Sequence, residues 1–135
     1  MAEYVKGDIV LTPFPLSGEE GFKVRPALVM AVLTYGRGFD CLLCIITTQK
    51  ADDPYLLSLD ISDIEGGRLT QQCYLRPTYT YAVSEGMIKR RLGHLRADKI
   101  AIAVQSLVSV LTRSANLTIT LFVSMPRTIF PAYCL

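Results

Sequence analysis

The sequence is short of the residues and motifs on which several classes of enzyme depend. It contains one histidine in 135 residues, so two histidines cannot share acid and base roles. It lacks the phosphate-loop motif G-x-x-x-x-G-K-[ST], the zinc-protease motif H-E-x-x-H and the nucleophile motif G-x-S-x-G. Its carboxylates are scattered, and Asp52–Asp53 lies in an expected loop. These absences argue against the enzyme classes that the motifs define.

Long hydrophobic runs are also missing. The longest uncharged runs, 100–112 and 114–126, are each about 13 residues long, which is too short to span a bilayer. Residues 1–8 are mixed and polar, without the apolar core of a signal peptide. We therefore expect a cytoplasmic protein without a membrane span. The net charge of +2 neither demands nor excludes a nucleic-acid partner.

The cysteines offer a weak case for a metal site. Cys41 and Cys44 form a C-x-x-C pair, but only Cys73 and His94 are obvious further ligands, and the spacing is poor. The flanks are strand-like, and residues three apart on a strand face opposite sides. We expect buried free cysteines, no bound metal and no cofactor.

Composition and periodicity predict a single mainly β domain. Half of the residues are hydrophobic, which is enough for a core without metals or disulfides. Apolar residues recur at helical spacing from Ile100 to Leu111, and a short helix or turn is expected within Ser84–Leu95. The expected strands are 7–14, 25–34, 40–49, 55–60 and 69–83, the last bent near Pro77. Short strands followed by one helix favour a small curled sheet or barrel with a packed helix.

One polar constellation joins two expected strands. The continuous apolar run after Arg25 implies a strand buried on both faces or a strongly curved sheet. A turn centred near residue 36 would bring Arg25 close to Thr47 and Thr48. An arginine fork beside a hydroxyl suits a phosphate group. The alternative is that Arg25 pairs with Glu19 or Glu20 of the preceding loop.

Two further constellations are open to two interpretations each. The basic stretch 88–96 could follow a nucleic-acid backbone or form a solvated helix face. Tyr74, Tyr79 and Tyr81, with Arg76 among them, could stack unpaired bases or cover the edge of the core.

Three segments in this order resemble one known family. They are "KGDIVLTPFPLSGEEGFKVRPALVM", "IITTQ" and "IKRRLGHL". From about Val5 to Leu111 the chain resembles the MazF/PemK-like toxins of type II toxin–antitoxin systems, in the Kid/CcdB superfamily. The resemblance implies an SH3-like small β-barrel with a C-terminal helix over residues 1–113, followed by an atypical apolar extension over 114–135.

The resemblance also implies an activity and partners. We expect a homodimeric, metal-independent endoribonuclease that cleaves single-stranded RNA at short sequences and is neutralised by a cognate antitoxin. Arg25 matches the family's catalytic arginine and Thr47 its catalytic serine or threonine. The residues expected to bind substrate are Thr48, Gln49, Glu20, Lys23 and Arg76. Some members carry an acidic residue where this chain has "QQC" at 71–73, so no proton-transfer role is assigned there.

Two alternatives to an RNase stay open. One is a non-enzymatic, gyrase-binding toxin like CcdB, and the other is an inactive toxin fold kept as a binding module. The pairing of Arg25 with Thr47 belongs to the RNase branch of the superfamily and favours the enzyme. The general base is the least defined part, and Glu19 or Glu20 is the candidate.

Overall fold

The computed structural model describes residues 2–15, 21–67 and 70–113. The expected extension 114–135 and the loop residues Glu19 and Glu20 lie outside this range. The strands are β1 (Asp8–Pro15), β2 (Phe22–Tyr35), β3 (Gly38–Thr47), β4 (Leu57–Leu59), β5 (Ile64–Glu65), β6 (Cys73–Ser84) and β7 (Arg90–Leu95). The helices are the 3₁₀ turns η1 (Ile61–Asp63) and η2 (Glu85–Met87) and the α-helix α1 (Ala97–Thr112).

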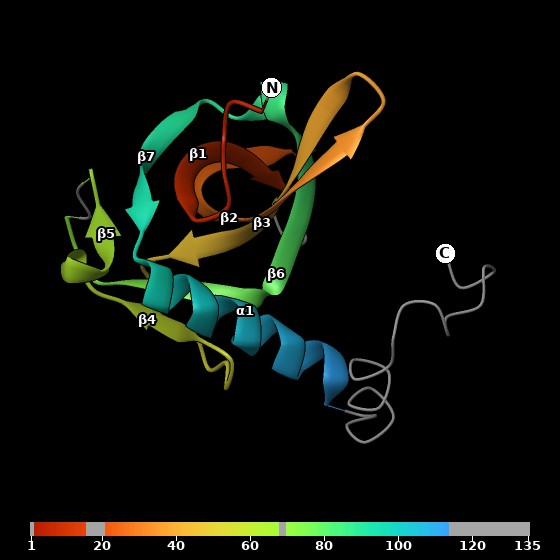
Figure 1. Cartoon of the computed structure of the whole chain (residues 1–135). Helices are drawn as coiled ribbons and strands as arrows, with labels where there is room; N and C mark the ends of the chain where they lie inside the picture. The colour runs from red at the N-terminus through yellow and green to blue at the C-terminus, as the bar shows by residue number, and fades with distance from the viewer. Residues whose placement is uncertain (1, 16–20, 68–69, 114–135) are drawn as a thin grey trace.

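The strands form one antiparallel sheet that curls into a barrel (Figure 1). Their order is β4-β6-β3-β2-β1-β7-β5, so β4 and β5 lie at opposite edges. These two edge strands are nevertheless neighbours in the chain, separated only by η1. Such a short connection forces the edges toward each other, because an extended chain rises only about 3.3 Å per residue. The predicted mainly β, SH3-like small barrel with a C-terminal helix is confirmed.

Both faces of the sheet are buried, as the apolar run of β2 predicts. Alternate residues of β2 enter two different clusters: Ala27 and Val29 pack with Val10 and Leu43, and Leu28 packs with the cluster beside α1. Ala27, Leu28, Val29 and Met30 are all buried. The first cluster fills the barrel, and the second lies between the sheet and the helix, which contacts β6 (Figure 1).

A β-bulge interrupts the pairing of β2 with β3. Ala31 pairs with Leu42, but Val29 pairs with Leu43, so Met30 has no partner on β3. An extra residue on one strand shifts the register of everything beyond it by one position. Between the bulge and the start of β2, the extra residue Met30 therefore shifts the pairing with β3 by one residue from the register that the turn sets.

The helix α1 begins and ends close to the predicted limits but buries only part of its apolar face. Ala103 is fully buried, and Ile100, Val104 and Leu107 pack against the outer cluster. Leu111, at the end of the same periodic pattern, is 70% exposed. Within the described ranges, none of the helices is long and apolar enough to cross a membrane.

The segment Ser84–Leu95 differs in part from its prediction. The expected short helix or turn is present as η2, but Arg90–Leu95 is strand β7, which pairs with β1. A helix face is thus the wrong description of the basic stretch. The strand escaped prediction because its run of basic residues hides the alternation that marks a half-buried strand.

Buried Asp8 explains two of these basic side chains. Its carboxylate is 3% exposed; Oδ2 accepts the Val5 N–H at 2.9 Å and lies 3.0 Å from Arg91 Nη2. The other oxygen, Oδ1, lies 3.0 Å from His94 Nδ1. Arg91 also donates to the carbonyl of Glu3 at 2.9 Å. Arg91 and His94 therefore hold β7 and the N-terminal segment to β1.

Cys41, Cys44 and Cys73 are free and buried, as expected. Cys41 lies in the barrel cluster and Cys44 in the outer cluster, which confirms that the pair faces opposite sides of β3. Burial, with smaller contributions from Glu85, Asp40 and Asp8, raises the pKa of Cys41 to about 11. Burial raises the pKa of Cys44 to about 12. Among the described residues, no group of three or more His, Cys, Asp or Glu side chains could hold a metal ion.

These thiols should be unreactive in the folded protein. In a Cys134→Ser background, we expect a thiol-specific disulfide reagent at pH 8 to label Cys41 and Cys44 only after denaturation, because reaction requires the thiolate. Their folded pKa values exceed the ordinary 9.0, so their contribution to stability is complete below about pH 9 and falls as the pH rises toward 11 to 12. Labelling of the native protein at the rate of the denatured chain would contradict this.

Candidate active site

Polar residues lie where three inward-facing rows of the barrel reach its mouth. Residues two apart on a strand share a face, so each row begins in the barrel cluster and ends at the rim. The rows are Val10–Thr12–Phe14 on β1, Val29–Ala27–Arg25 on β2 and Leu43–Ile45–Thr47 on β3. The barrel core thus positions the candidate side chains by alternation alone.

Arg25 and Thr47 lie on neighbouring strands at this mouth. Ala27 pairs with Ile45, and the same register continued by two residues places Arg25 opposite Thr47. Both line a cavity of about 160 Å³. Its walls are formed by Phe14, Pro15, Arg25, Ile45, Thr47, Gln49, Arg76 and Tyr79.

Four of the predicted site residues are brought together here, namely Arg25, Thr47, Gln49 and Arg76. Thr48 and Lys23 are exposed and do not line the cavity. Glu20 lies outside the described residues, so its predicted role stays a prediction.

Arg25 and Thr47 both retain hydrogen-bonding capacity toward the cavity. Arg25 is half-buried opposite the fully buried Thr12, and no ion pair joins it to a carboxylate within the described part of the chain. Oγ1 of Thr47 accepts the backbone N–H of Gln49 at 3.2 Å. That bond uses a lone pair of the hydroxyl and leaves its hydrogen free to donate.

Arg76 is held on two sides and keeps one unsatisfied donor. Its guanidinium lies 3.9 Å from the ring centroid of Tyr79, and its Nε lies 3.5 Å from Oδ2 of Asp53. That separation makes an ion pair, but Nε is buried without a hydrogen-bond partner. An unpaired buried donor costs free energy. The ion pair and the ring contact thus fix Arg76 as a cation beside the cavity.

Asp53 is a contributor that the sequence did not reveal, whereas Tyr79 was named there as one of three tyrosines that could stack bases. Asp53 was expected to be an ordinary loop carboxylate, but it accepts the Tyr55 N–H at 2.9 Å and the Thr78 hydroxyl at 3.3 Å. These bonds fix it against Arg76. The only signal in the sequence was the proximity of Arg76 to Tyr79, which does not indicate a partner 23 positions upstream.

The tyrosines divide between the two interpretations. Tyr81 packs on Phe14 with ring centroids 5.4 Å apart, so it covers the edge of the core. Tyr79 is 40% exposed at the cavity, and half-buried Tyr74 lines a neighbouring pocket. Only the last two are open to a ligand.

The cavity is suited to an anion. Among its described wall residues are two guanidinium groups, the hydroxyls of Thr47 and Tyr79 and one amide, and no carboxylate. Guanidinium groups bind phosphate oxygens in pairs of parallel hydrogen bonds. The apolar side chains of Phe14, Ile45 and Tyr79 partly exclude water and so strengthen these interactions.

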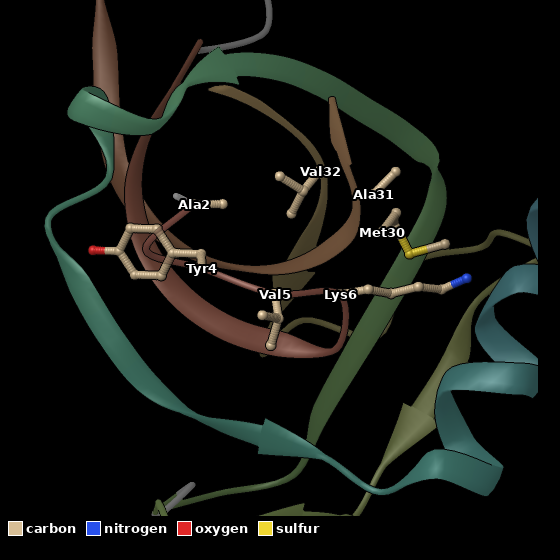
Figure 2. Close-up of a pocket in the computed structure, with 7 residues that line it drawn as sticks. All are labelled: Ala2, Tyr4, Val5, Lys6, Met30, Ala31 and Val32. Carbon is tan, nitrogen blue, oxygen red and sulfur yellow. The ribbon is translucent and has the colours of Figure 1, made fainter. Parts of the chain in front are cut away.

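A larger pocket, of about 440 Å³, has a different character (Figure 2). It is lined by Ala2, Tyr4, Val5, Lys6, Met30, Ala31 and Val32. Lys6 is its one charged lining residue, and Figure 2 shows aliphatic side chains and one tyrosine around the rest. Without converging donors this pocket cannot stabilise a reacting phosphate, so the smaller cavity is the candidate active site.

The fold is shared with one solved toxin and two solved endoribonucleases. A mycobacterial endoribonuclease in complex with its cognate antitoxin is 13% identical, with a TM-score of 0.58 over 80% of this chain and 94% of that one. The Mycobacterium tuberculosis toxin MazF-mt6 is 17% identical, with a TM-score of 0.54 over 74% and 91%. Another mycobacterial endoribonuclease is 13% identical, with a TM-score of 0.56 over 82% and 93%.

Sequence comparison defines the family. The family model of PemK-like, MazF-like toxins of type II toxin–antitoxin systems matches residues 5–111. The chain belongs to this family. A search of curated proteins gave no match.

Proposed function

We propose that this toxin is an endoribonuclease that cleaves single-stranded RNA, including mRNA, at short sequences in the cytoplasm and so arrests growth. The observation that carries the proposal is the cavity in which Arg25, Thr47 and Arg76 converge without a carboxylate among the described wall residues. The two structural neighbours described as endoribonucleases add support through their shared fold. The pairing of Arg25 with Thr47 supports this function over a gyrase-binding or inactive toxin.

The proposed reaction uses the substrate's own nucleophile. The 2′-oxygen of the ribose attacks the adjacent phosphorus, the new O2′–P bond forms, and the P–O5′ bond breaks. The products are a 2′,3′-cyclic phosphate and a 5′-hydroxyl. The protein contributes by fixing this in-line geometry and by stabilising the charge that grows on the nonbridging oxygens.

Each cavity residue has a distinct part in this proposal. Arg25 binds the pentavalent phosphate with two parallel hydrogen bonds. Thr47 donates its free hydroxyl hydrogen to a nonbridging oxygen. Arg76, which lines the cavity, binds the same or the neighbouring phosphate. Gln49 lies beside Thr47 and contacts the substrate from the rim.

Two protons must move, and neither Arg25 nor Thr47 accepts one readily at neutral pH. One leaves the 2′-hydroxyl and one reaches the departing 5′-oxygen. We propose that Glu19 or Glu20, which come between β1 and β2 in the sequence, acts as the base. Thr48, next to Thr47, and Lys23, two residues before Arg25, are exposed and stay candidates for contacts with the RNA backbone.

The proposed partners follow from the family and from one structural neighbour. That neighbour was solved with its cognate antitoxin, and we propose that an antitoxin neutralises this chain as well. We also propose a homodimer. Exposed apolar side chains on α1, namely Ile102, Val108 and Leu111, support it, because a second copy would remove them from water.

The purified protein should cleave single-stranded RNA in excess EDTA at the rate seen without chelator, since the proposed chemistry uses no metal. The new 5′ ends should accept label from polynucleotide kinase without prior phosphatase treatment, which identifies 5′-hydroxyl groups. A duplex of the same sequence serves as a control and should resist cleavage. Loss of activity on chelation would show that the mechanism is wrong.

A further inference from the structure

A third pocket, distinct from the one in Figure 2 although also of about 440 Å³, adjoins the candidate active-site cavity. Asp53 lines this pocket, Arg76 lines the cavity, and the ion pair between them forms the shared wall. The volume lies within the range that accommodates a nucleotide-sized ligand. Its other polar lining residues are Lys50, Ser58, Gln72 and Tyr74, and the set is here called the Gln72 pocket.

The Gln72 pocket opens on the same face of the sheet as the cavity. Gln72, Tyr74 and Arg76 alternate with the buried residues Cys73 and Leu75, so all three project from one face of the chain at β6. Successive members of such a row stand about 6.8 Å apart. Tyr74 also pairs with Thr47 across the strands, which places both side chains on one face. A single strand lying on Thr47 would therefore continue along β6.

Hydrogen bonds fix the amide of Gln72. Its Nε2 donates to Ser58 Oγ at 2.6 Å and to the carbonyl of Leu59 at 3.3 Å. A carbonyl can only accept, so the nitrogen must occupy this position, and Oε1 is left as an acceptor. The Ser58 hydroxyl accepts from Gln72 and can donate its own hydrogen. The pocket thus presents one acceptor and one donor close together.

The remaining lining residues suit the rest of a nucleotide. Half-buried Tyr74 pairs with Ser58 across β4 and β6, so its ring stands beside these polar groups. Exposed Lys50 forms no ion pair with the carboxylates of the described residues and is available for a phosphate. Asp53 forms an ion pair with Arg76 and accepts hydrogen bonds from Thr78 and Tyr55, so it lines the pocket without being free to bind a ligand.

We propose that the Gln72 pocket binds the nucleobase next to the cleaved phosphodiester and sets the sequence preference there. The proposal rests on the proposed RNase function. Gln72 and Ser58 read the hydrogen-bonding edge of the base, and Tyr74 stacks on its face, as aromatic side chains on sheets do with unpaired bases. The Arg76–Asp53 pair separates this base from the reacting phosphate.

The test compares cleavage-site profiles on a randomised RNA pool for the wild type and four variants. Gln72→Glu should change the preferred base at one position beside the cut, because a carboxylate removes the amide donor that orients the pocket. Gln105→Glu, on the exposed face of α1, is the matched control and should leave the profile unchanged. Tyr74→Ala should lower kcat/KM by roughly ten- to a hundred-fold, and Tyr74→Phe should retain most of it.

A second readout separates this proposal from the RNase proposal. Binding of 2′-O-methyl RNA, which cannot be cleaved, is measured by fluorescence anisotropy for the same variants. If the wild type cleaves RNA and Gln72→Glu and Tyr74→Ala keep its profile and kcat/KM, the base pocket is wrong and the RNase stands. If the wild type cleaves nothing but its binding depends on Gln72 and Tyr74, the pocket stands only as an RNA-binding site and the RNase is wrong. Absence of both binding and cleavage overturns both.

Discussion

Replacing Arg25 with alanine is expected to reduce RNA cleavage by at least 10²- to 10³-fold, because removing one preorganised donor to a developing oxyanion has costs of about this size. The barrel should stay folded. Arg25 stands at the end of its inward row, is half-buried, and has no carboxylate partner in the described ranges that its loss would leave unpaired. Single-turnover cleavage of a defined RNA, with circular dichroism melting in parallel, measures both effects.

Two matched variants sharpen this result. Arg37→Ala removes an exposed arginine from the turn between β2 and β3 and should leave the rate unchanged. Arg25→Lys keeps the charge but not the planar fork, so we expect intermediate activity. If Arg25→Ala is folded and retains more than about a tenth of wild-type activity, Arg25 does not stabilise the pentavalent phosphate as proposed.

Replacing Asp8 with alanine is expected to have the largest effect on stability, lowering the free energy of unfolding by about 2–4 kcal/mol. The carboxylate is buried and serves the Val5 N–H, Arg91 and His94 at once. Its loss leaves these three groups without their partner. The figure lies below the range for fully buried ion pairs, because Arg91 and His94 are 48% and 38% exposed and regain water.

Urea denaturation followed by circular dichroism measures this loss. Asp52→Ala, in an exposed loop, is the control and should change stability by less than about 0.5 kcal/mol. Asp8→Asn keeps the shape but not the charge and should fall between the two. Because Asp8 does not line the cavity, cleavage by folded Asp8→Ala at low temperature should match the wild type. A loss of stability under about 1 kcal/mol would show that the three contacts are weak.

The sequence predicted those parts of the fold that depend on local pattern. The strand run after Arg25 and the periodicity of α1 need no distant partner, and both were predicted correctly. The approach of Arg25 to residues 47–48 follows from the position of one turn, because an antiparallel hairpin fixes the sum of its paired residue numbers.

Other features depend on partners that only the folded chain brings together. Strand β7 exists because β1 supplies its hydrogen bonds and Asp8 balances its basic side chains, neither of which shows in the run from Arg90 to Leu95. The ion pair that fixes Arg76 joins this strand residue to Asp53, a loop carboxylate 23 positions earlier in the chain. No periodicity in either segment indicates the other, so the Gln72 pocket could not be predicted.

The unpaired Met30 determines which of two adjacent threonines can take part in the proposed reaction. At the turn, Tyr35 pairs with Gly38, and that register continued without interruption would place Thr48 opposite Arg25. The extra residue moves the register by one, so that Thr47 stands there and Thr48 projects to the other side. Met30 is five residues from Arg25, about 17 Å along the strand. With the bulge retained, an insertion between the turn and Arg25 would thus place Thr48 opposite Arg25, and a deletion would place Ile46 there, so the proposed site depends on the length of this stretch of barrel wall as well as on its hydrophobicity.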